Sequence, residues 1–513
     1  MLVKCYGSAI AGIDALTITV EVSVTPGVEY AIVGLPDSAV RESLFRMAAA
    51  FEYNGYKKPG KRVVVNLSPA DIRKEGSAYD LTIAVGILAA SEQIDASRVG
   101  DYVIMGELSL DGTILPVRGA LPIAVRAREE GFKGLILPRR NAPEAAVVNN
   151  LEVYGVDNLK DVTDFLNGDR EPEPLKIDTR EEYFSRIARF ADDFSDVRGQ
   201  EHVKRALEVA AAGGHNVLMI GPPGSGKTML AKRMPTIVPP MTLKEALETT
   251  KIHSVAGKTG TGTGLIAQRP FRSPHHSASA VSIVGGGASP QPGEISLAHN
   301  GILFLDELPE FPRNVLEVLR QPLEDKTITV SRAKYTIEYP CNFMLIASMN
   351  PCPCGYYNHP ARPCSCNPGM IARYMNRISG PLLDRIDMHI EVTPVEVGKL
   401  SEERAGESSA DIRKRVMQAR KLQTERFRND TIHTNAMMTS RHIREHCVLT
   451  PQSTRLLEEA MLRLNLSARA YDRIIKLART IADLAGMPYI LPPHIAEAIG
   501  YRSLDRETWG AVQ

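Results

Sequence analysis

The stretch 217–228, VLMIGPPGSGKT, contains the residues whose types and spacing point most directly to chemistry. Its first four residues are apolar and predict a short buried parallel strand, and a glycine-rich turn follows that ends in Lys227 and Thr228. Glycines let the backbone bend sharply and direct several N–H groups at one anion, a lysine reaches terminal phosphates, and a threonine hydroxyl can hold Mg²⁺. A chance glycine turn is the alternative, which the helix-like segment 229–234 disfavours. We therefore predict a phosphate-binding loop formed by Gly221, Pro222, Pro223, Gly224, Ser225, Gly226, Lys227 and Thr228.

Two further apolar runs end in polar side chains that suit the same chemistry. The run GILFLDE ends in Asp306 and Glu307, of which we expect the first to hold Mg²⁺ through its water shell and the second to orient the attacking water. The run FMLIASMN predicts another buried strand, and its last residue, Asn350, is placed to hydrogen-bond that water or the γ-phosphate. An asparagine that closes a turn before Pro351 is the alternative for this residue.

Four of the seven cysteines lie within fifteen residues, in the order CPC, nine residues, CSC. Four thiolates on two short arms can close the tetrahedral shell that structural zinc prefers, so we predict a Zn²⁺ site. The CxC spacing departs from the more usual CxxC, His359 is an alternative ligand, and four reduced cysteines packed in a loop are the other interpretation. The predicted ligands are Cys352, Cys354, Cys364 and Cys366.

The scaffold for these residues divides into four parts. Residues 1–167 mix strand-like and helix-like runs and predict an α/β domain, and the charged, proline-punctuated stretch 168–193 predicts a linker. Strands that alternate with helices over 194–394 predict a doubly wound, mostly parallel sheet that carries the cysteine loop 352–366. Only helical patterns follow over 395–513, which predicts a helical lid. The expected fold class is therefore α/β.

The expected elements can be stated by residue range. We expect strands at 16–24, 62–66, 102–105, 134–137, 217–220, 301–305 and 342–348, and helices at 39–53, 81–90, 120–130, 201–212, 409–427, 440–445, 451–464, 468–484 and 493–499. A formal net charge of +1 identifies no partner. No run of about 18 apolar residues and no signal-peptide pattern occurs, so we expect a cytoplasmic protein without a membrane partner.

The stretch 249–300 is rich in glycine and basic residues. Mobile segments with cations and backbone donors suit a central channel that grips a phosphate chain without reading its sequence. For the paired histidines we rank packing or interface use first, DNA contact second and metal binding last. The candidates are Lys251, Lys258, Arg269, Arg272, His275 and His276.

Taken together, the phosphate loop and the stretches GILFLDELPEF, ASMNPCPCG and SGPLLDRIDMHIEV resemble magnesium-chelatase-like AAA+ ATPases of the ComM/YifB type, over nearly the whole chain. The resemblance implies a homo-hexameric ring that hydrolyses ATP with Mg²⁺ between subunits and moves single-stranded or branched DNA. For the ComM type it implies branch migration in recombination during natural transformation, with recombination proteins as further partners.

The resemblance also assigns roles to individual residues. Arg385 matches the arginine finger that reaches the ATP of the neighbouring subunit, which makes hydrolysis depend on assembly. Arg469 best matches the second sensor and Arg473 is the runner-up; an exposed helix arginine is the alternative for both. The resemblance places Lys227 and Thr228 in the first nucleotide motif, Asp306 and Glu307 in the second, and Asn350 as the first sensor.

The first domain resembles the Lon-protease type of domain, whose catalytic pair is a serine and a lysine. Ala78 stands at the position of the serine and Ile123 at that of the lysine. The adjacent Ser77 would lack a base to take its proton, so we predict no proteolysis. We expect a role in ring assembly or as a DNA-facing platform, with Arg62, Arg73, Lys74 and Arg118 as surface candidates and plain solvated charge as the alternative.

The leading hypothesis is an ATPase that works as a hexameric DNA motor. Its rival is a magnesium-chelatase-type, ATP-driven remodeller of a protein or metal-insertion complex. A protease or a non-enzymatic scaffold agrees less well with the residues present.

Overall fold

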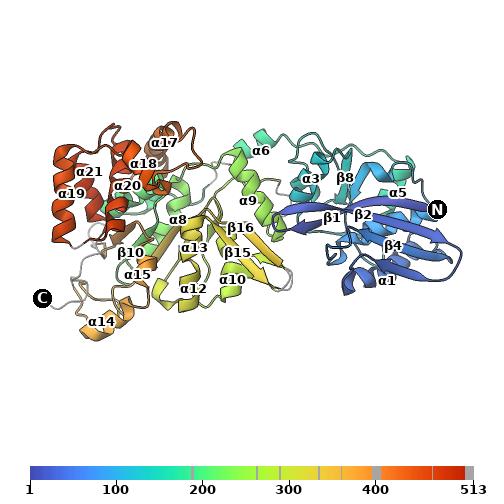
Figure 1. The fold of residues 1–513 in the computed structure, drawn as a ribbon, viewed down its shortest axis with the longest axis horizontal. Coiled ribbons are helices and arrows are strands. Elements are labelled where there is room, and N and C mark those ends of the chain that lie inside the picture. Colours follow the sequence, from blue (N-terminus) through green and yellow to red (C-terminus); the bar gives the residue numbers. More distant parts are fainter. Residues whose placement is uncertain are drawn as a thin grey trace.

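The computed structural model describes residues 1–186, 190–260, 264–287, 290–332, 335–359, 361–395, 406–464 and 466–502. Three parts lie in line along the long axis of the molecule (Figure 1): the first domain at one end, a part with a parallel sheet in the middle, and a group of helices at the other end. The predicted α/β fold class is confirmed. In the described ranges, no helix combines the length and the apolar character needed to cross a membrane.

The first domain is built on a seven-stranded mixed sheet in the order β3-β4-β2-β1-β5-β8-β9. The residues of β2 alternate between buried and more exposed positions, as expected for a strand with one face on the core. Helix α2 is apolar except for Asp80 and Thr82, and every one of its residues is buried. The main strands are β1 (Leu2–Ala11), β2 (Asp14–Thr25), β3 (Tyr30–Val33), β4 (Arg62–Ser68), β5 (Tyr102–Ile104), β8 (Gly134–Pro138) and β9 (Glu152–Val156). The remaining elements are the strands β6 (Glu107–Leu108) and β7 (Ile114–Leu115), with the helices α1 (Ser38–Tyr53), α2 (Asp80–Ala90), α3 (Ala120–Glu129), α4 (Ala142–Ala145) and α5 (Leu159–Asn167).

The central part holds a five-stranded, all-parallel sheet in the order β11-β14-β17-β10-β18. Strand β10 lies between β17 and β18, and its four residues are at most 1% exposed. The strands are β10 (Val217–Ile220), β11 (Phe271–Arg272), β14 (Ile302–Leu305), β17 (Met344–Met349) and β18 (Met388–Glu391). Two hairpins add β12 (Gly285–Gly286) with β13 (Gln291–Pro292), and β15 (Thr327–Arg332) with β16 (Tyr335–Pro340). The helices are α7 (Glu201–Gly213), α8 (Lys227–Ile237), α9 (Leu243–Val255), α10 (Ala280–Val284), α11 (Glu294–Leu297), α12 (Arg313–Val318), α13 (Arg320–Asp325), α14 (Pro368–Met375) and α15 (Gly380–Leu383).

The carboxyl-terminal part is helical and shares one hydrophobic core with the sheet. Helix α20 buries Ile474, Leu477, Ala478 and Ile481, which recur every three to four residues and pack in the same cluster as Val217 of β10. Its helices are α17 (Ser409–Arg426), α18 (Ser440–His446), α19 (Pro451–Arg463), α20 (Ala468–Leu484) and α21 (Pro492–Gly500). Short 3₁₀ turns occur at Ser77–Tyr79, Val99–Asp101, Phe194–Asp196, Leu308–Glu310 and Asn435–Met437.

The first domain is joined to the central part by direct contacts as well as by the chain. Helix α3 packs against α9, and the amide of Gly119 donates to the carbonyl of Ser254 at 3.1 Å. Lys251 Nζ lies 3.1 Å from Asp14 Oδ1. Within the predicted linker 168–193 the structure contains helix α6 (Thr179–Arg186), whose Tyr183 packs in an apolar cluster with residues of both parts.

Candidate functional site

The predicted phosphate-binding loop connects the carboxyl end of β10 to the first turn of α8. Gly224 and Gly226 have φ values of 76° and 89°, in the left-handed region that favours glycine. A Cβ on Gly221 would lie 2.1 Å from the carbonyl oxygen of Val392, so this position has no room for a side chain. The loop therefore exposes backbone amides at the start of an eleven-residue helix, as an anion site requires.

Lys227 lies over this loop, where its side chain contacts one residue from a second strand. Its Nζ donates to the carbonyls of Gly221 at 2.7 Å and Pro222 at 2.9 Å, and to Oδ1 of Asn350 at 3.3 Å. Burial lowers the pKa of the Lys227 ammonium. The structure thus brings together the predicted lysine and the predicted first sensor.

Asp306 is held between two hydroxyl groups at the carboxyl end of β14. Thr228 Oγ1 donates to its Oδ2 at 2.8 Å, and Ser348 Oγ donates to its Oδ1. Mg²⁺ commonly uses one or two protein oxygens and keeps several waters, so the adjacent Thr228 hydroxyl and Asp306 carboxylate fit this ion. Ser348 was not predicted from the sequence, although its place two residues before Asn350 in a buried strand could have suggested it.

Glu307 occupies a left-handed backbone conformation, with φ of 54°, directly after β14. Such conformations in non-glycine residues cost free energy and cluster at functional sites. Its Oε2 lies 3.5 Å from Nδ1 of His276. The rings of His275 and His276 are 4.0 Å apart, and His275 Nδ1 is paired with Ser277 Oγ. The structure therefore brings His276, but not His275, next to the predicted water-orienting carboxylate.

The other candidates in the stretch 249–300 have intramolecular partners. Lys251 pairs with Asp14 of the first domain. Lys258 and Arg272 share Glu294, at 3.2 Å and 2.6 Å. The guanidinium of Arg269 donates to the carbonyls of Pro239, Pro240 and Asn300. A role for these residues on DNA stays a prediction.

The predicted finger and sensor arginines lie at the other end of the sheet. Arg385 precedes β18; its Nη1 donates to Pro381 O at 2.6 Å, its Nη2 lies 2.5 Å from Glu324 Oε1, and its side chain is 11% exposed. Arg469 lies 3.3 Å from Asp384 and is 65% exposed, and Arg473 pairs with Asp387.

A parallel strand pair explains this separation. Strand β18 runs in register with β10, from Val217 opposite Met388 to Ile220 opposite Glu391. The loop follows the last pair and Arg385 precedes the first, so about 10 Å of strand separates their levels. One chain therefore does not bring Arg385 to its own phosphate loop.

The four predicted cysteine ligands converge. Their sulfur atoms all lie within 4.8 Å of one another, and the separations among those of Cys352, Cys354 and Cys364 are 3.3–3.6 Å. Sulfurs around a tetrahedral Zn²⁺ with 2.3 Å bonds would be about 3.8 Å apart, so the group fits this ion. His359 is outside it, because its Nδ1 accepts from the amides of Ala361 and Arg362.

The cysteine loop also packs on the phosphate loop. A Cβ on Gly355 would lie 2.7 Å from Cδ of Pro223, so the two loops are in close contact at this glycine. A shift of the backbone at Gly355 toward Pro223 would therefore press on the predicted phosphate-binding loop.

In the first domain, neither predicted counterpart of the protease pair supplies a reactive group. Ile123 is 2% exposed in the core, and Ala78 packs partly buried against the same cluster. Of the surface candidates, Lys74 was wrongly placed: it is fully buried, its Nζ donates to Pro69 O, and burial lowers its pKa. Arg62 and Arg73 pair with Glu29 and Glu75.

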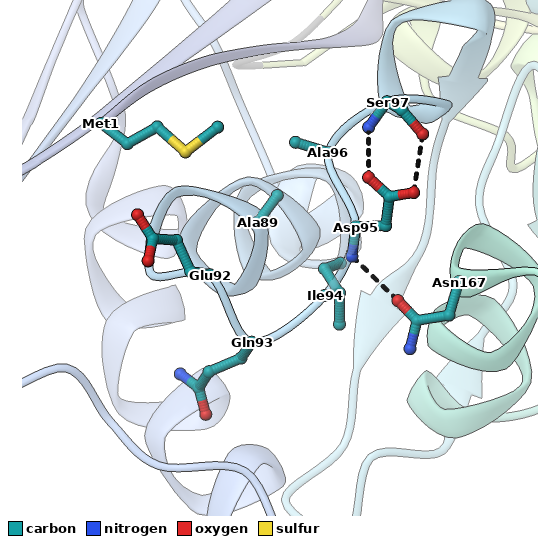
Figure 2. Close-up of a pocket in the computed structure, with 9 residues that line it drawn as sticks. All are labelled: Met1, Ala89, Glu92, Gln93, Ile94, Asp95, Ala96, Ser97 and Asn167. Carbon is teal, nitrogen blue, oxygen red and sulfur yellow. Dashed lines mark hydrogen bonds between the residues drawn. The ribbon is translucent and has the colours of Figure 1, made fainter.

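A hollow of about 680 Å³ in the same domain offers no reactive arrangement (Figure 2). The carboxylate of Asp95 accepts from the amide and the hydroxyl of Ser97, at 2.9 Å and 2.7 Å, and the amide of Asp95 donates to Asn167. These hydrogen bonds of Asp95 therefore hold the loop that contains Asp95 and Ser97 in place.

Comparisons with known proteins agree with this organisation. Three family models match: magnesium chelatase, subunit ChlI, over residues 193–400; subunit ChlI of Mg-chelatase over 20–141; and the carboxyl-terminal model of that subunit over 406–502. The chain is 45% identical to competence protein ComM of Haemophilus influenzae, over 98% of this chain and 97% of the relative. It is 45% identical to the protein YifB of Salmonella typhimurium, over 97% and 96%. A peroxisomal Lon protease homolog of Arabidopsis thaliana is 30% identical over 24% of this chain and 14% of the relative.

The lysine and the glutamate of the site have separable predicted effects. Lys227→Ala removes the cation over the phosphate loop, so we expect nucleotide affinity to fall by at least about a hundredfold. Glu307→Gln keeps the loop and Asp306 intact, so we expect it to retain nucleotide and to turn over at least about a hundred times more slowly. Fluorescent-nucleotide titration and phosphate-release kinetics on both variants check this. Equal affinity in the wild type and Lys227→Ala would contradict the loop assignment.

Proposed function

The chain belongs to the ComM/YifB type of magnesium-chelatase-like AAA+ proteins, and from this premise we propose that it is an ATP-driven, hexameric DNA motor with branch-migration activity in recombination or natural transformation. Membership of this AAA+ family implies ATPase activity. The observation that carries the proposal is the convergence of the loop, the paired carboxylates and the sensor amide at one edge of the sheet. These are Lys227, Thr228, Asp306, Glu307 and Asn350.

Each of these side chains has a task that its geometry supports. The loop amides and Lys227 would hold the phosphates of ATP, and Thr228 with Asp306 would hold Mg²⁺, which would neutralise phosphate charge. Glu307 orients the attacking water, and Asn350 positions the γ-phosphate through its side-chain amide. Arg385 of one subunit would complete the site of the next. Such a head-to-tail interface gives a closed ring when its rotation closes, and we propose that it does so here.

The proposal that the motor acts on DNA rests on the sequence resemblance and on the relative that is named a competence protein. The magnesium-chelatase names of the family models favour a second candidate, a remodeller of a protein or metal-insertion complex. We place the protein in the cytoplasm, where ATP and recombination proteins meet. None of the seven cysteines, all of which the structure describes, is in a disulfide, which agrees with a reducing compartment.

ATPase rates measured with and without single-stranded or branched DNA, together with the mass of the protein in ATP, test the proposal. We expect ATP-dependent assembly to about six chains and a rate that rises severalfold with DNA, because occupied channel contacts favour the hydrolysing arrangement. Glu307→Gln should assemble without turnover and serves as the control. A chain that stays monomeric in saturating ATP and ignores every nucleic acid would refute the DNA motor.

We further propose that Cys352, Cys354, Cys364 and Cys366 hold one structural Zn²⁺. Elemental analysis should give about one zinc per chain, and the double variant Cys354→Ser/Cys364→Ser should lose it. Cys447→Ala, which changes a buried cysteine outside the group, should retain zinc. Because the loop packs on Pro223, we also expect the double variant to bind nucleotide more weakly. Zinc well below one per chain in protein purified without chelator would count against the site.

A further inference from the structure

A second cavity, with both polar and apolar lining residues, lies at the end of the parallel sheet opposite the phosphate loop. It has a volume of about 570 Å³. Its floor includes Asn216, Gly301 and Phe343, which precede strands β10, β14 and β17, and its other walls include residues of the carboxyl-terminal helices α17 and α20. The cavity therefore lies between the sheet and the helical part, at the amino ends of the strands.

The side chains that line this cavity carry more positive than negative charge. They comprise six lysines and arginines against four carboxylates. Three arginines are each paired with one carboxylate, in the pairs Arg269–Glu245, Arg385–Glu324 and Arg473–Asp387. The fourth carboxylate, Asp325, is exposed. Three cations remain, and within the described part of the chain none of them has a carboxylate oxygen within 4.0 Å.

These three cations come from separate elements. Lys326 follows α13, Arg420 is on α17 and Lys476 is on α20, and all three are half-buried. Lys476 Nζ donates to Ala436 O at 3.2 Å, and Arg420 directs Nε and Nη2 to Ala211 O. Among the described residues, Lys326 Nζ and Arg420 Nη1 have no hydrogen-bond partner.

The burial of these three cations shifts their pKa values. Burial lowers the pKa of Lys326 and of Lys476, and it lowers the pKa of Arg420 to about 9. A desolvated cation without a counter-ion destabilises the folded state, and an anion of opposite charge removes that cost. The charges of Asp387 and Arg473 affect the pKa values of both Lys326 and Lys476, so the two lysines face a common region of the cavity.

We propose that this cavity binds a phosphate-bearing anion, such as inorganic phosphate or a phosphate monoester, between Lys326 of the central part and Arg420 and Lys476 of the helical part. Ammonium and guanidinium donors that three separate elements contribute to one cavity suit a multiply charged, tetrahedral oxyanion. The anion ties the helices to the amino ends of the strands. The site goes beyond the proposed function, because it requires neither ATP hydrolysis nor DNA.

The phosphate can have two sources. It is free in solution, as we propose, or it belongs to a nucleotide on a neighbouring subunit, since Arg385 also lines the cavity. A Lys227→Ala background separates these sources, because its own phosphate loop is disabled and an unmixed sample then contains no nucleotide-loaded neighbour.

Thermal unfolding of Lys227→Ala, titrated with sodium phosphate at constant ionic strength against sodium chloride, tests the proposal. We expect saturable stabilisation by phosphate. Adding Lys326→Gln and Lys476→Gln should weaken the apparent affinity by at least about tenfold, as expected for the loss of two charge-assisted contacts. The matched control is Lys421→Gln, an exposed residue on the same helix as Arg420, which should leave the response unchanged.

The same measurement separates a binding site from a purely structural role. Without phosphate, the Lys326→Gln/Lys476→Gln protein should unfold at an equal or higher temperature, because two half-buried charges without a carboxylate partner have been removed. A lower unfolding temperature together with an unchanged phosphate response would overturn the proposal. So would a response seen only after mixing with ATP-loaded Glu307→Gln subunits. No arm uses ATPase activity or DNA, so a failed motor hypothesis leaves the result intact.

Discussion

The parallel pairing of β10 with β17 and β18 is the constraint on which the rest of the structure depends. Parallel strands place all their carboxyl ends at one edge of a sheet and all their amino ends at the other. The loop after β10, the carboxylates after β14 and the amide after β17 therefore meet at one edge. Arg385 precedes β18 and belongs to the opposite edge, where it pairs with Glu324. The nucleotide chemistry is thus divided between two ends of each chain, which is why we assign its completion to a neighbouring subunit.

Contacts around the phosphate loop connect it to the rest of the chain. Gly355 joins the cysteine loop to Pro223, and Ser348 and Thr228 share the carboxylate of Asp306. At the opposite edge, the cavity with Lys326, Arg420 and Lys476 lies beside Arg385. The two ends of the sheet therefore differ: the residues proposed to bind phosphate and metal lie at one, and an excess of half-buried positive charge lies at the other.

The sequence predicted the fold class and the elements that hold the nucleotide residues. The ends of the fifteen expected strands and helices outside the loop strand lie within two residues of those observed, because each has a clear apolar period or run. Lys227 and Asn350 were both expected after buried parallel strands, and the structure brings their side chains into contact.

What the sequence did not predict depends on tertiary contacts. Ser348 and His276 reach Asp306 and Glu307 only because of how β17 and the segment after β11 pack against β14. Lys74 was placed on the surface, although it folds inward onto Pro69 O. The local sequence does not show whether the side chain of a lysine or arginine lies in solvent or folds inward onto another group of the protein.

The central claim, that one subunit completes the site of the next, is tested most directly by mixing two inactive variants, Arg385→Ala and Lys227→Ala. At equal mixing, about a quarter of the interfaces in a ring would join an intact loop to an intact arginine. ATPase activity should reappear on mixing and stay absent when Arg385→Ala is mixed with the double variant Arg385→Ala/Lys227→Ala. A mixture that remains inactive although mass measurement shows mixed rings, or an Arg385→Ala protein that hydrolyses ATP at the wild-type rate by itself, would contradict it.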